Sequence, residues 1–204
     1  MLVEYSSKIF RWLFPAVWRE YGEGKFVCLT FDDGPVEGVT SQVLDILDKY
    51  SVKATFFCVG DNVRQSPDLF SEIKSRGHSV GNHTMHHIKG FEHSIEGYVR
   101  DVEEANVSIK SRLFRPPYGR IRFSQLLRIK KNYRVIMWDV ITRDYNQNLS
   151  PEKCLQVVKK HTKSGSIIVF HDSVKAAKNM LYALPKAIEW LKAEGYEFRL
   201  IDER

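Results

Sequence analysis

Short apolar runs alternate with longer stretches of helical spacing along the whole chain. Apolar runs between turn residues indicate buried strands, whereas apolar residues three or four positions apart indicate the inner face of a helix. Seven runs predict strands at residues 26–29, 54–59, 78–81, 113–115, 133–140, 166–170 and 196–201. Six stretches predict helices at residues 40–50, 67–76, 94–111, 123–131, 151–162 and 178–194. This alternation predicts an α/β fold, a distorted (β/α) barrel of about seven parallel strands with the helices outside.

Local signals mark where several of these helices begin. Thr40 or Ser41 is a candidate N-cap of the first helix, because a hydroxyl oxygen can accept a bond from a free backbone N–H there. Serine followed by proline at 66–67 and at 150–151 combines an N-cap with a residue suited to the first helical position. These signals support the helix assignments.

The length of 204 residues fits one domain, which we place at residues 26–204. Residues 1–25 contain Trp12, Leu13 and Trp18 among basic residues, which predicts a short amphipathic segment packing on the barrel. Weak peripheral contact with a membrane is the alternative. The chain has no apolar run long enough to cross a bilayer and no secretory signal pattern, so we expect a cytoplasmic protein.

Cysteine content and charge narrow the classes of function. Cys28, Cys58 and Cys154 are widely spaced without a Cys-x-x-Cys pair, which predicts free thiols. The net charge is +6, and residues 110–134 contain nine Lys or Arg with no Asp or Glu. That stretch could meet an anionic substrate or a membrane, although a solvated surface is the simpler interpretation. No RNA-binding or helix-turn-helix pattern accompanies it, so a nucleic-acid partner is not expected.

Polar clusters follow the predicted strands, each at a carboxyl end. They are Asp32 and Asp33, residues 83–87, Arg115, residues 139–144, and His171. In barrel-like α/β folds the carboxyl ends of the strands meet on one face, where active sites assemble. The sequence therefore predicts one site built from remote segments.

A metal site is the first candidate chemistry. Histidines at i and i+4 of a helical turn can direct both rings to one ion, and Asp33 could supply a third ligand. Either His86 or His87 could pair with His83, because both spacings occur in helices. Two imidazoles and one carboxylate leave positions open for water and substrate, as a catalytic site requires. The adjacent Asp32 is then free to accept a proton.

Four ordered motifs resemble the polysaccharide deacetylases with a NodB-homology domain, carbohydrate esterase family four. They are Thr-Phe-Asp-Asp-Gly-Pro at 30–35, His-Thr-Met-His-His at 83–87, Arg-Pro-Pro-Tyr-Gly at 115–119 and Val-Phe-His at 169–171. The resemblance covers roughly residues 26–201. It implies that residues 26–204 form a catalytic domain, and that Asp33, His83 and His87 bind a divalent metal. Zinc is the expected ion, with cobalt, nickel or manganese as alternatives.

The resemblance also implies catalytic roles. Asp32 matches the catalytic base, and Arg115 matches the arginine that orients it. His171 matches the general acid, and Asp144 matches the carboxylate that tunes this histidine. Tyr118 matches the residue whose backbone N–H helps to hold the oxyanion. Together these residues imply a metal-dependent N-deacetylase that hydrolyses the acetamide of an amino-sugar glycan and releases acetate.

The residues expected to contact substrate are Tyr118, Trp138, Tyr145 and Val169, the last in the apolar position of the acetyl pocket. Where many family members have Asp-x-x-Asp-Trp, this chain has Ile141 and Tyr145 as the first and last residues of that motif. Substrate shape can therefore differ. The competing hypotheses are an amidase of the same fold acting on a small non-sugar amide, and a catalytically inactive carbohydrate-binding descendant.

Overall fold

The computed structural model describes residues 14–202, so most of the predicted amphipathic segment, residues 1–13, lies outside the described residues. All paired strands of its sheet are parallel and follow the order β5-β4-β3-β2-β1-β7-β6, with β8 beside β1. The strands are β1 (Phe26–Asp32), β2 (Thr55–Cys58), β3 (Ser79–Asn82), β4 (Leu113–Phe114), β5 (Arg134–Val135), β6 (Val140–Ile141), β7 (Ser166–His171) and β8 (Glu197–Phe198).

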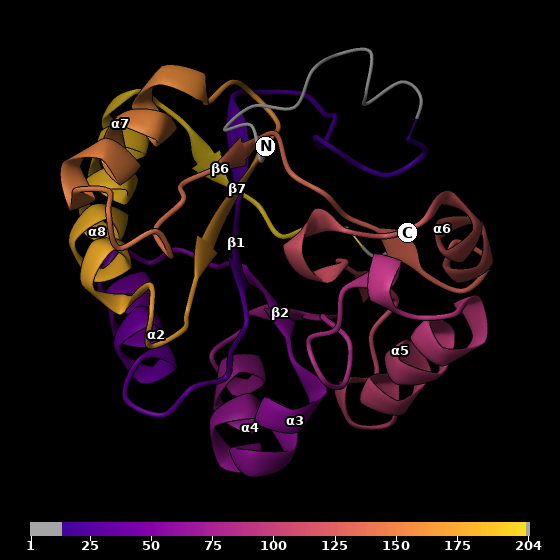
Figure 1. The fold of residues 1–204 in the computed structure, drawn as a ribbon. Helices are drawn as coiled ribbons and strands as arrows, with labels where there is room; N and C mark the ends of the chain where they lie inside the picture. The colour runs from indigo at the N-terminus through magenta and orange to yellow at the C-terminus, as the bar shows by residue number, and fades with distance from the viewer. Residues whose placement is uncertain (1–13, 203–204) are drawn as a thin grey trace.

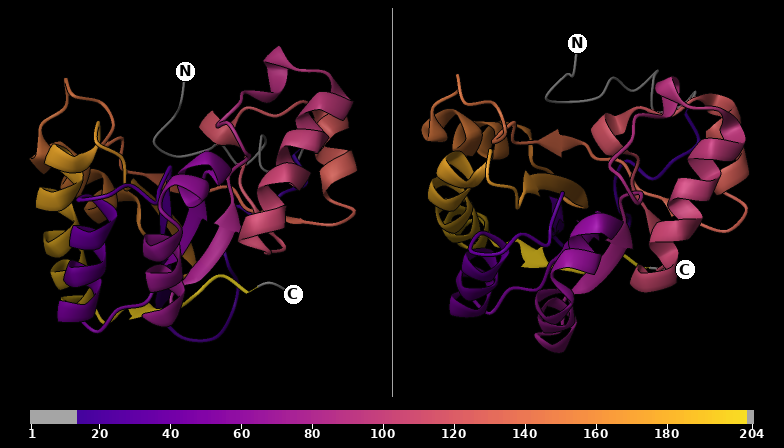
Figure 2. Two further views of the ribbon diagram at one scale, coloured as in Figure 1. Left: turned by 90° about the horizontal axis from the view of Figure 1, so that it is seen from below. Right: turned by 60° about the horizontal axis from the view of Figure 1, so that its bottom comes forward.

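Helices cover the outside of this sheet, as Figures 1 and 2 show. They are α2 (Thr40–Lys49), α3 (Gly60–Gln65), α4 (Pro67–Ser75), α5 (Ile95–Ile109), α6 (Phe123–Ile129), α7 (Pro151–His161) and α8 (Ala177–Ala193), with short 3-10 turns η1 (Gly90–Glu92) and η2 (Pro117–Gly119). The sheet curls into a half-barrel, so the predicted distorted (β/α) barrel is confirmed. Helix α3 had not been predicted.

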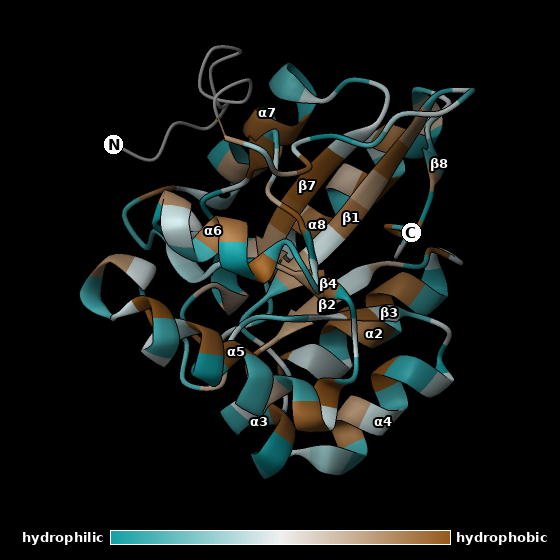
Figure 3. Cartoon of the chain, turned by 90° about the vertical axis from the view of Figure 1, so that its right-hand side faces the viewer, coloured by the Kyte–Doolittle hydropathy of each residue, from teal (hydrophilic) through white to brown (hydrophobic). Residues whose placement is uncertain are grey.

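Strand β1 lies in the interior of the sheet and is buried along its whole length. It pairs with β2 on one side and β7 on the other, and both β1 and β7 are predominantly hydrophobic in Figure 3. The register sets Asp32 directly beside His171 at the carboxyl ends of the two strands. Backbone pairing alone therefore brings these two residues together from opposite ends of the chain.

The prediction of a single strand at 133–140 is wrong, because the chain forms two short strands there, β5 and β6. Between them, Ile136 bridges to Val17 and the backbone N–H of Met137 donates to the Val17 carbonyl. Asp139 is buried and accepts hydrogen bonds from Arg19, the Ser166 hydroxyl and the Ile167 N–H. Pairing with the segment before β1 thus replaces a continuous strand.

The structure confirms only some of the predicted helix N-caps. The Ser150 hydroxyl accepts from the N–H of Lys153, as an N-cap should, whereas Ser66 occupies the cap position of α4 without such a bond. Val39 is the N-cap residue of α2, so the assignment of Thr40 or Ser41 is wrong. The Thr40 hydroxyl instead donates to Asp172, a tertiary partner that local sequence does not reveal.

The core lies on both faces of the sheet. All three cysteines are free thiols, as predicted, and the structure buries all three. Trp18 packs in the cluster that includes Phe26 and Ile201, so this part of the segment before β1 belongs to the core. Within residues 14–202, no helix combines the length and apolarity needed to span a bilayer.

Candidate active site

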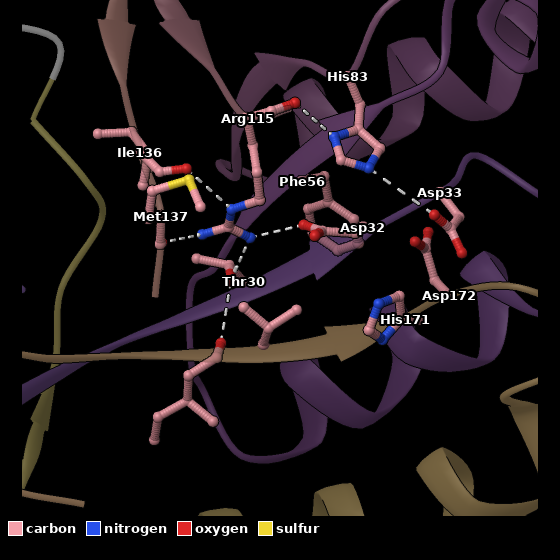
Figure 4. Close-up of polar contacts among 12 residues, drawn as sticks. Thr30, Asp32, Asp33, Phe56, His83, Arg115, Ile136, Met137, His171 and Asp172 are labelled. Atoms are coloured by element: carbon pink, nitrogen blue, oxygen red, sulfur yellow. Dashed lines mark hydrogen bonds and ion pairs between the residues drawn. The ribbon is translucent and has the colours of Figure 1, made fainter. Parts of the chain in front are cut away.

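The end of β1 presents two adjacent carboxylates in different directions (Figure 4). Asp32 is buried, whereas Asp33 has a left-handed backbone with φ of 87° and turns toward the histidines. Asp172 holds the turn that follows: its carboxylate accepts from the Gly34 N–H at 3.0 Å and from the Thr40 hydroxyl at 2.6 Å. The carboxylates of Asp32 and Asp33 therefore point in different directions although the two residues are adjacent in sequence.

Arg115 is fully buried, and its guanidinium donates four hydrogen bonds (Figure 4). Its Nη1 donates to Asp32 Oδ1 at 2.6 Å and to the Thr30 hydroxyl at 2.8 Å. Its other nitrogens donate to the carbonyls of Ile136 and Met137. Burial lowers the pKa of Arg115, and the Asp32 charge opposes that shift. The guanidinium is fixed by four partners and in turn fixes the Asp32 carboxylate.

Asp33, His83 and His87 offer one ligand atom each within 4.8 Å of one another, the only such group among residues 14–202. The Nε2 atoms of His87 and His83 lie 3.2 and 3.9 Å from Asp33 Oδ1. His83 Nδ1 donates to the Arg115 carbonyl at 2.7 Å, which leaves its Nε2 without a proton and directed toward Asp33. Two imidazoles and a carboxylate fit a divalent cation such as zinc.

The pKa values of this group suit ligand chemistry. Burial lowers the pKa of His83 to about 4, so its ring is neutral and its lone pair is available. Burial alone would raise the pKa of Asp33, but the hydrogen bond from His87 and the charge of His171 hold it well below its usual range. A neutral imidazole beside an ionised carboxylate is the state that binds a metal.

The loop that carries the histidines is not helical, so the helical-turn reasoning is wrong. Thr84 and His87 have positive φ values of 66° and 54°. Asp101 on α5 accepts from the Met85 and His86 N–H groups at 2.8 and 3.2 Å, and its other oxygen lies 2.5 Å from His86 Nδ1. Because Asp101 draws His86 away, His87 is the partner of His83.

His171 forms a second polar pair with Asp144, which is fully buried. His171 Nδ1 lies 2.8 Å from Asp144 Oδ1, and its backbone N–H donates to Oδ2. Burial alone would lower the pKa of His171, but the Asp144 carboxylate overrides it and raises the pKa to about 9. The imidazole is therefore protonated at neutral pH and can donate a proton.

One cavity of about 430 Å³ joins these groups. Its lining residues are Asp32, Asp33, His83, His87, Tyr118, Trp138, Ile141, Tyr145, His171, Ser173 and Lys175. Val169, predicted to line the acetyl pocket, is fully buried in β7 and does not line this cavity, whereas its neighbour Ile141 does. Tyr118 adopts a left-handed backbone with φ of 59°, and its ring packs against His87.

Sequence reasoning missed several residues that shape the site. Asp101 and Asp172 anchor two of its loops, and Asn179 on α8 donates to the Asp144 carbonyl. Ser173 and Lys175 line the cavity. None belongs to an apolar periodicity or a local turn signal. The only available clue was the position of Asp172, Ser173 and Lys175 directly after a strand end.

Comparison with known proteins agrees with this geometry. The family model described as polysaccharide deacetylase matches residues 19–136. A peptidoglycan-N-acetylglucosamine deacetylase of Bacillus cereus is 34% identical over 194 residues, which cover 91% of this chain and 91% of that protein.

Solved structures share the fold. A peptidoglycan N-acetylglucosamine deacetylase in complex with 4-naphthalen-1-yl-N-oxidanyl-benzamide superposes with a TM-score of 0.88 at 27% identity, covering 97% of this chain and 95% of that one. A pseudoenzyme of carbohydrate esterase family four from Bacillus anthracis superposes with a TM-score of 0.82 at 28% identity, covering 92% and 68% of the two chains. The chain belongs to the polysaccharide deacetylases, carbohydrate esterase family four.

Proposed function

We propose that this chain is a metal-dependent hydrolase that removes N-linked acetyl groups from an amino-sugar glycan or glycan precursor. Water is consumed, the C–N bond of the acetamide breaks, and acetate and a free amine are released. Two observations support the reaction class: family membership, and the union of a ligand group, a carboxylate base and a protonated histidine in one cavity.

Asp33, His83 and His87 would hold the divalent cation. When bound, such an ion polarises the acetamide carbonyl and lowers the pKa of water toward ~7. The hydrogen bond from His83 Nδ1 to the Arg115 carbonyl sets the tautomer and the orientation of the His83 ring, so that its Nε2 is available to bind the cation.

Asp32 acts as the general base in this proposal. Its carboxylate lines the cavity, and Arg115 occupies one of its oxygens. The other oxygen is left to accept the proton of the attacking water. Positioned general bases contribute about 10²–10⁴-fold to rate, so the rigidity that Arg115 provides matters for catalysis.

His171 acts as the general acid. Its Nδ1 is occupied by Asp144, which directs Nε2 as the proton donor to the leaving nitrogen. The nitrogen of an amide is a poor leaving group until it is protonated. The Asp144 carboxylate keeps His171 charged for this step and holds its ring in place.

The remaining walls suit the substrate. In this proposal the backbone N–H of Tyr118, which lies in the turn η2 beside the cavity, stabilises the developing oxyanion. Trp138, Ile141 and Tyr145 form apolar surface in the cavity and would accommodate the acetyl methyl group. Ile141 takes the position expected for Val169, which changes the identity of the pocket wall without removing its apolar character.

The observation that carries the proposal is the position of His171 and Asp32 beside each other in register, in the cavity that also contains the ligand group. An inactive descendant has no need of a complete set of base, acid and ligands. The discriminating experiment is mass spectrometry of N-acetylglucosamine oligomers after incubation with zinc-loaded protein, with small acetamides in parallel.

Loss of acetyl mass from the oligomers, absent in an Asp32→Asn variant, would support the glycan deacetylase. Turnover of small amides alone would favour the same-fold amidase instead. If neither substrate is hydrolysed although zinc is bound, the carbohydrate-binding alternative is favoured.

A further inference from the structure

Lys175 is a cation in the catalytic cavity for which the proposed mechanism has no role. It lies in the connection between β7 and α8, is exposed, and lines the cavity together with Ser173. Within residues 14–202 no carboxylate forms an ion pair with it. Lysine is a flexible point charge, and an unpaired ammonium in a ligand cleft attracts anionic groups.

The other charges at or directly behind the cavity wall are paired or belong to the ligand group. Arg115 pairs with Asp32 at 2.6 Å and Asp144 with His171 at 2.8 Å, while Asp33 would offset part of the charge of a bound divalent cation. With that cation bound, Lys175 adds a positive charge that no side chain of the cavity wall pairs with. A cleft with such an excess binds anionic ligands more readily than neutral ones.

A second cation near the cavity differs from Lys175 in this respect. The Lys89 ammonium lies 5.3 Å from the centre of the Tyr118 ring, but it is also 3.1 Å from Glu92 Oε1. Its charge is compensated locally. This contrast assigns the unbalanced charge of the cavity to the β7–α8 connection.

The start of α8 adds to the same field. This helix begins at Ala177, two residues after Lys175, and runs for 17 residues. It has no acidic residue in its first turn and no side-chain cap. The partial positive charge at the start of this helix therefore has no carboxylate in its own first turn and has the same sign as the charge of Lys175.

We infer that Lys175 forms an anion subsite at the catalytic cavity, so that the preferred substrate carries a carboxylate or phosphate on the acetylated sugar or on its neighbour. This inference rests on the proposed function. A neutral glycan would contact the ammonium only through hydroxyl groups, whereas an anionic substituent gains a charge-assisted hydrogen bond. Because Lys175 is exposed, we expect a selectivity of about 2- to 5-fold.

The test compares three acetylated ligands: a neutral N-acetylglucosamine tetramer, a tetramer of the same length containing N-acetylmuramic acid, and UDP-N-acetylglucosamine. The second carries a carboxylate and the third a pyrophosphate, so the comparison separates the two sources of negative charge. The readout is the ratio of kcat/KM for each anionic ligand to that for the neutral one. The variants are Lys175→Met, Lys175→Arg and, as matched control, Lys178→Met.

Lys178 is exposed on α8, does not line the cavity and carries the same charge. We expect Lys175→Met to lower the selectivity ratio about 2- to 5-fold for at least one anionic ligand, and Lys175→Arg to retain it. Lys178→Met should match the wild type. Added salt should lower the wild-type ratio, because exposed charges are screened. An unchanged ratio in Lys175→Met, or an equal loss in Lys178→Met, overturns the inference.

Dissociation constants for the same ligands, measured by calorimetry on metal-loaded protein with Asp32→Asn in each variant, separate the subsite from the catalytic proposal. A Lys175-dependent preference in binding without turnover by the wild type would leave the subsite standing and reject the proposed function. Turnover of all three ligands with no Lys175-dependent preference would do the reverse.

Discussion

The guanidinium of Arg115 donates a 2.6 Å hydrogen bond to the carboxylate of Asp32, and both side chains are buried. The same Arg115 accepts, through its backbone carbonyl, the hydrogen bond that orients His83. One residue therefore connects the proposed base with the proposed metal ligands. Its side chain holds the base through four hydrogen bonds, while its backbone holds the ligand His83.

Replacing the arginine should destabilise the fold. In Arg115→Met the carboxylate of Asp32 stays buried without its cation, a situation that costs about 3–5 kcal/mol of the free energy of unfolding. Urea unfolding measures the change. In Arg64→Met, which breaks an exposed pair with Glu104, the loss should stay within about 1 kcal/mol. Equal losses in both variants would contradict the structural importance of the buried pair.

The roles of general base and metal ligand should be distinguishable when turnover and metal content are measured on the same variants. Asp32→Asn removes the proton acceptor but none of the proposed ligands, so turnover should fall about 10²–10⁴-fold while the metal is retained. His83→Ala removes a ligand and should lose metal and activity together. Elemental analysis of the purified variants gives the metal content. Equal metal loss in both would rule out this division of roles.

The Asp144–His171 pair predicts a pH dependence. Because the pKa of His171 is raised from 6.5 to about 9, the imidazole is protonated up to that pH, and kcat/KM should decline as the pH rises through about 9. Asp144→Asn removes the main cause of the upward shift and should move this decline to lower pH. The control Asp45→Asn alters an exposed carboxylate on α2 and should leave the profile unchanged.

The stability of the fold should follow the same titration. A group whose pKa is higher in the folded than in the unfolded protein stabilises the fold while it is protonated in both states. The contribution of His171 is therefore full below about pH 6.5 and is lost as the pH rises through about 9. The unfolding midpoint should therefore fall more at alkaline pH in the wild type than in Asp144→Asn. Equal falls in the two proteins would contradict a stabilising role of the Asp144–His171 pair.

Asp101 should affect metal affinity from outside the ligand group. It holds the backbone of Met85 and His86 and so sets the shape of the loop between His83 and His87. Loss of such supporting contacts typically weakens metal binding about 10–100-fold. Titration of Asp101→Asn with zinc against a chromophoric chelator measures this. Glu104→Gln, one turn away on the same helix, should bind zinc as tightly as the wild type.

The order of the elements and the face that carries the site could be predicted from local pattern. Apolar runs define buried strands, and parallel strands place their carboxyl ends on one edge, so the sequence alone predicts that Asp32, Arg115 and His171 meet there. The motifs resembled a family for the same reason, since each motif is a strand end with its turn.

Long-range contacts decided the rest. The choice of His87 over His86 depends on Asp101, which is distant in sequence and bonds His86. The break at 136–139 depends on Val17 and on the buried carboxylate of Asp139. Local spacing cannot encode either outcome, because each is set by a partner on another element.

The sequence by itself determined which residues end the strands and hence which chemistry reaches the cavity. Only the tertiary structure decided which of those side chains face one another and that Ile141 rather than Val169 lines the wall. It also decided that Lys175 lies there with no ion pair to a carboxylate of residues 14–202. The physical reason is that a strand's position follows from its own burial pattern. Side-chain pairing and the balance of charge depend on neighbours that the chain brings together only when it folds.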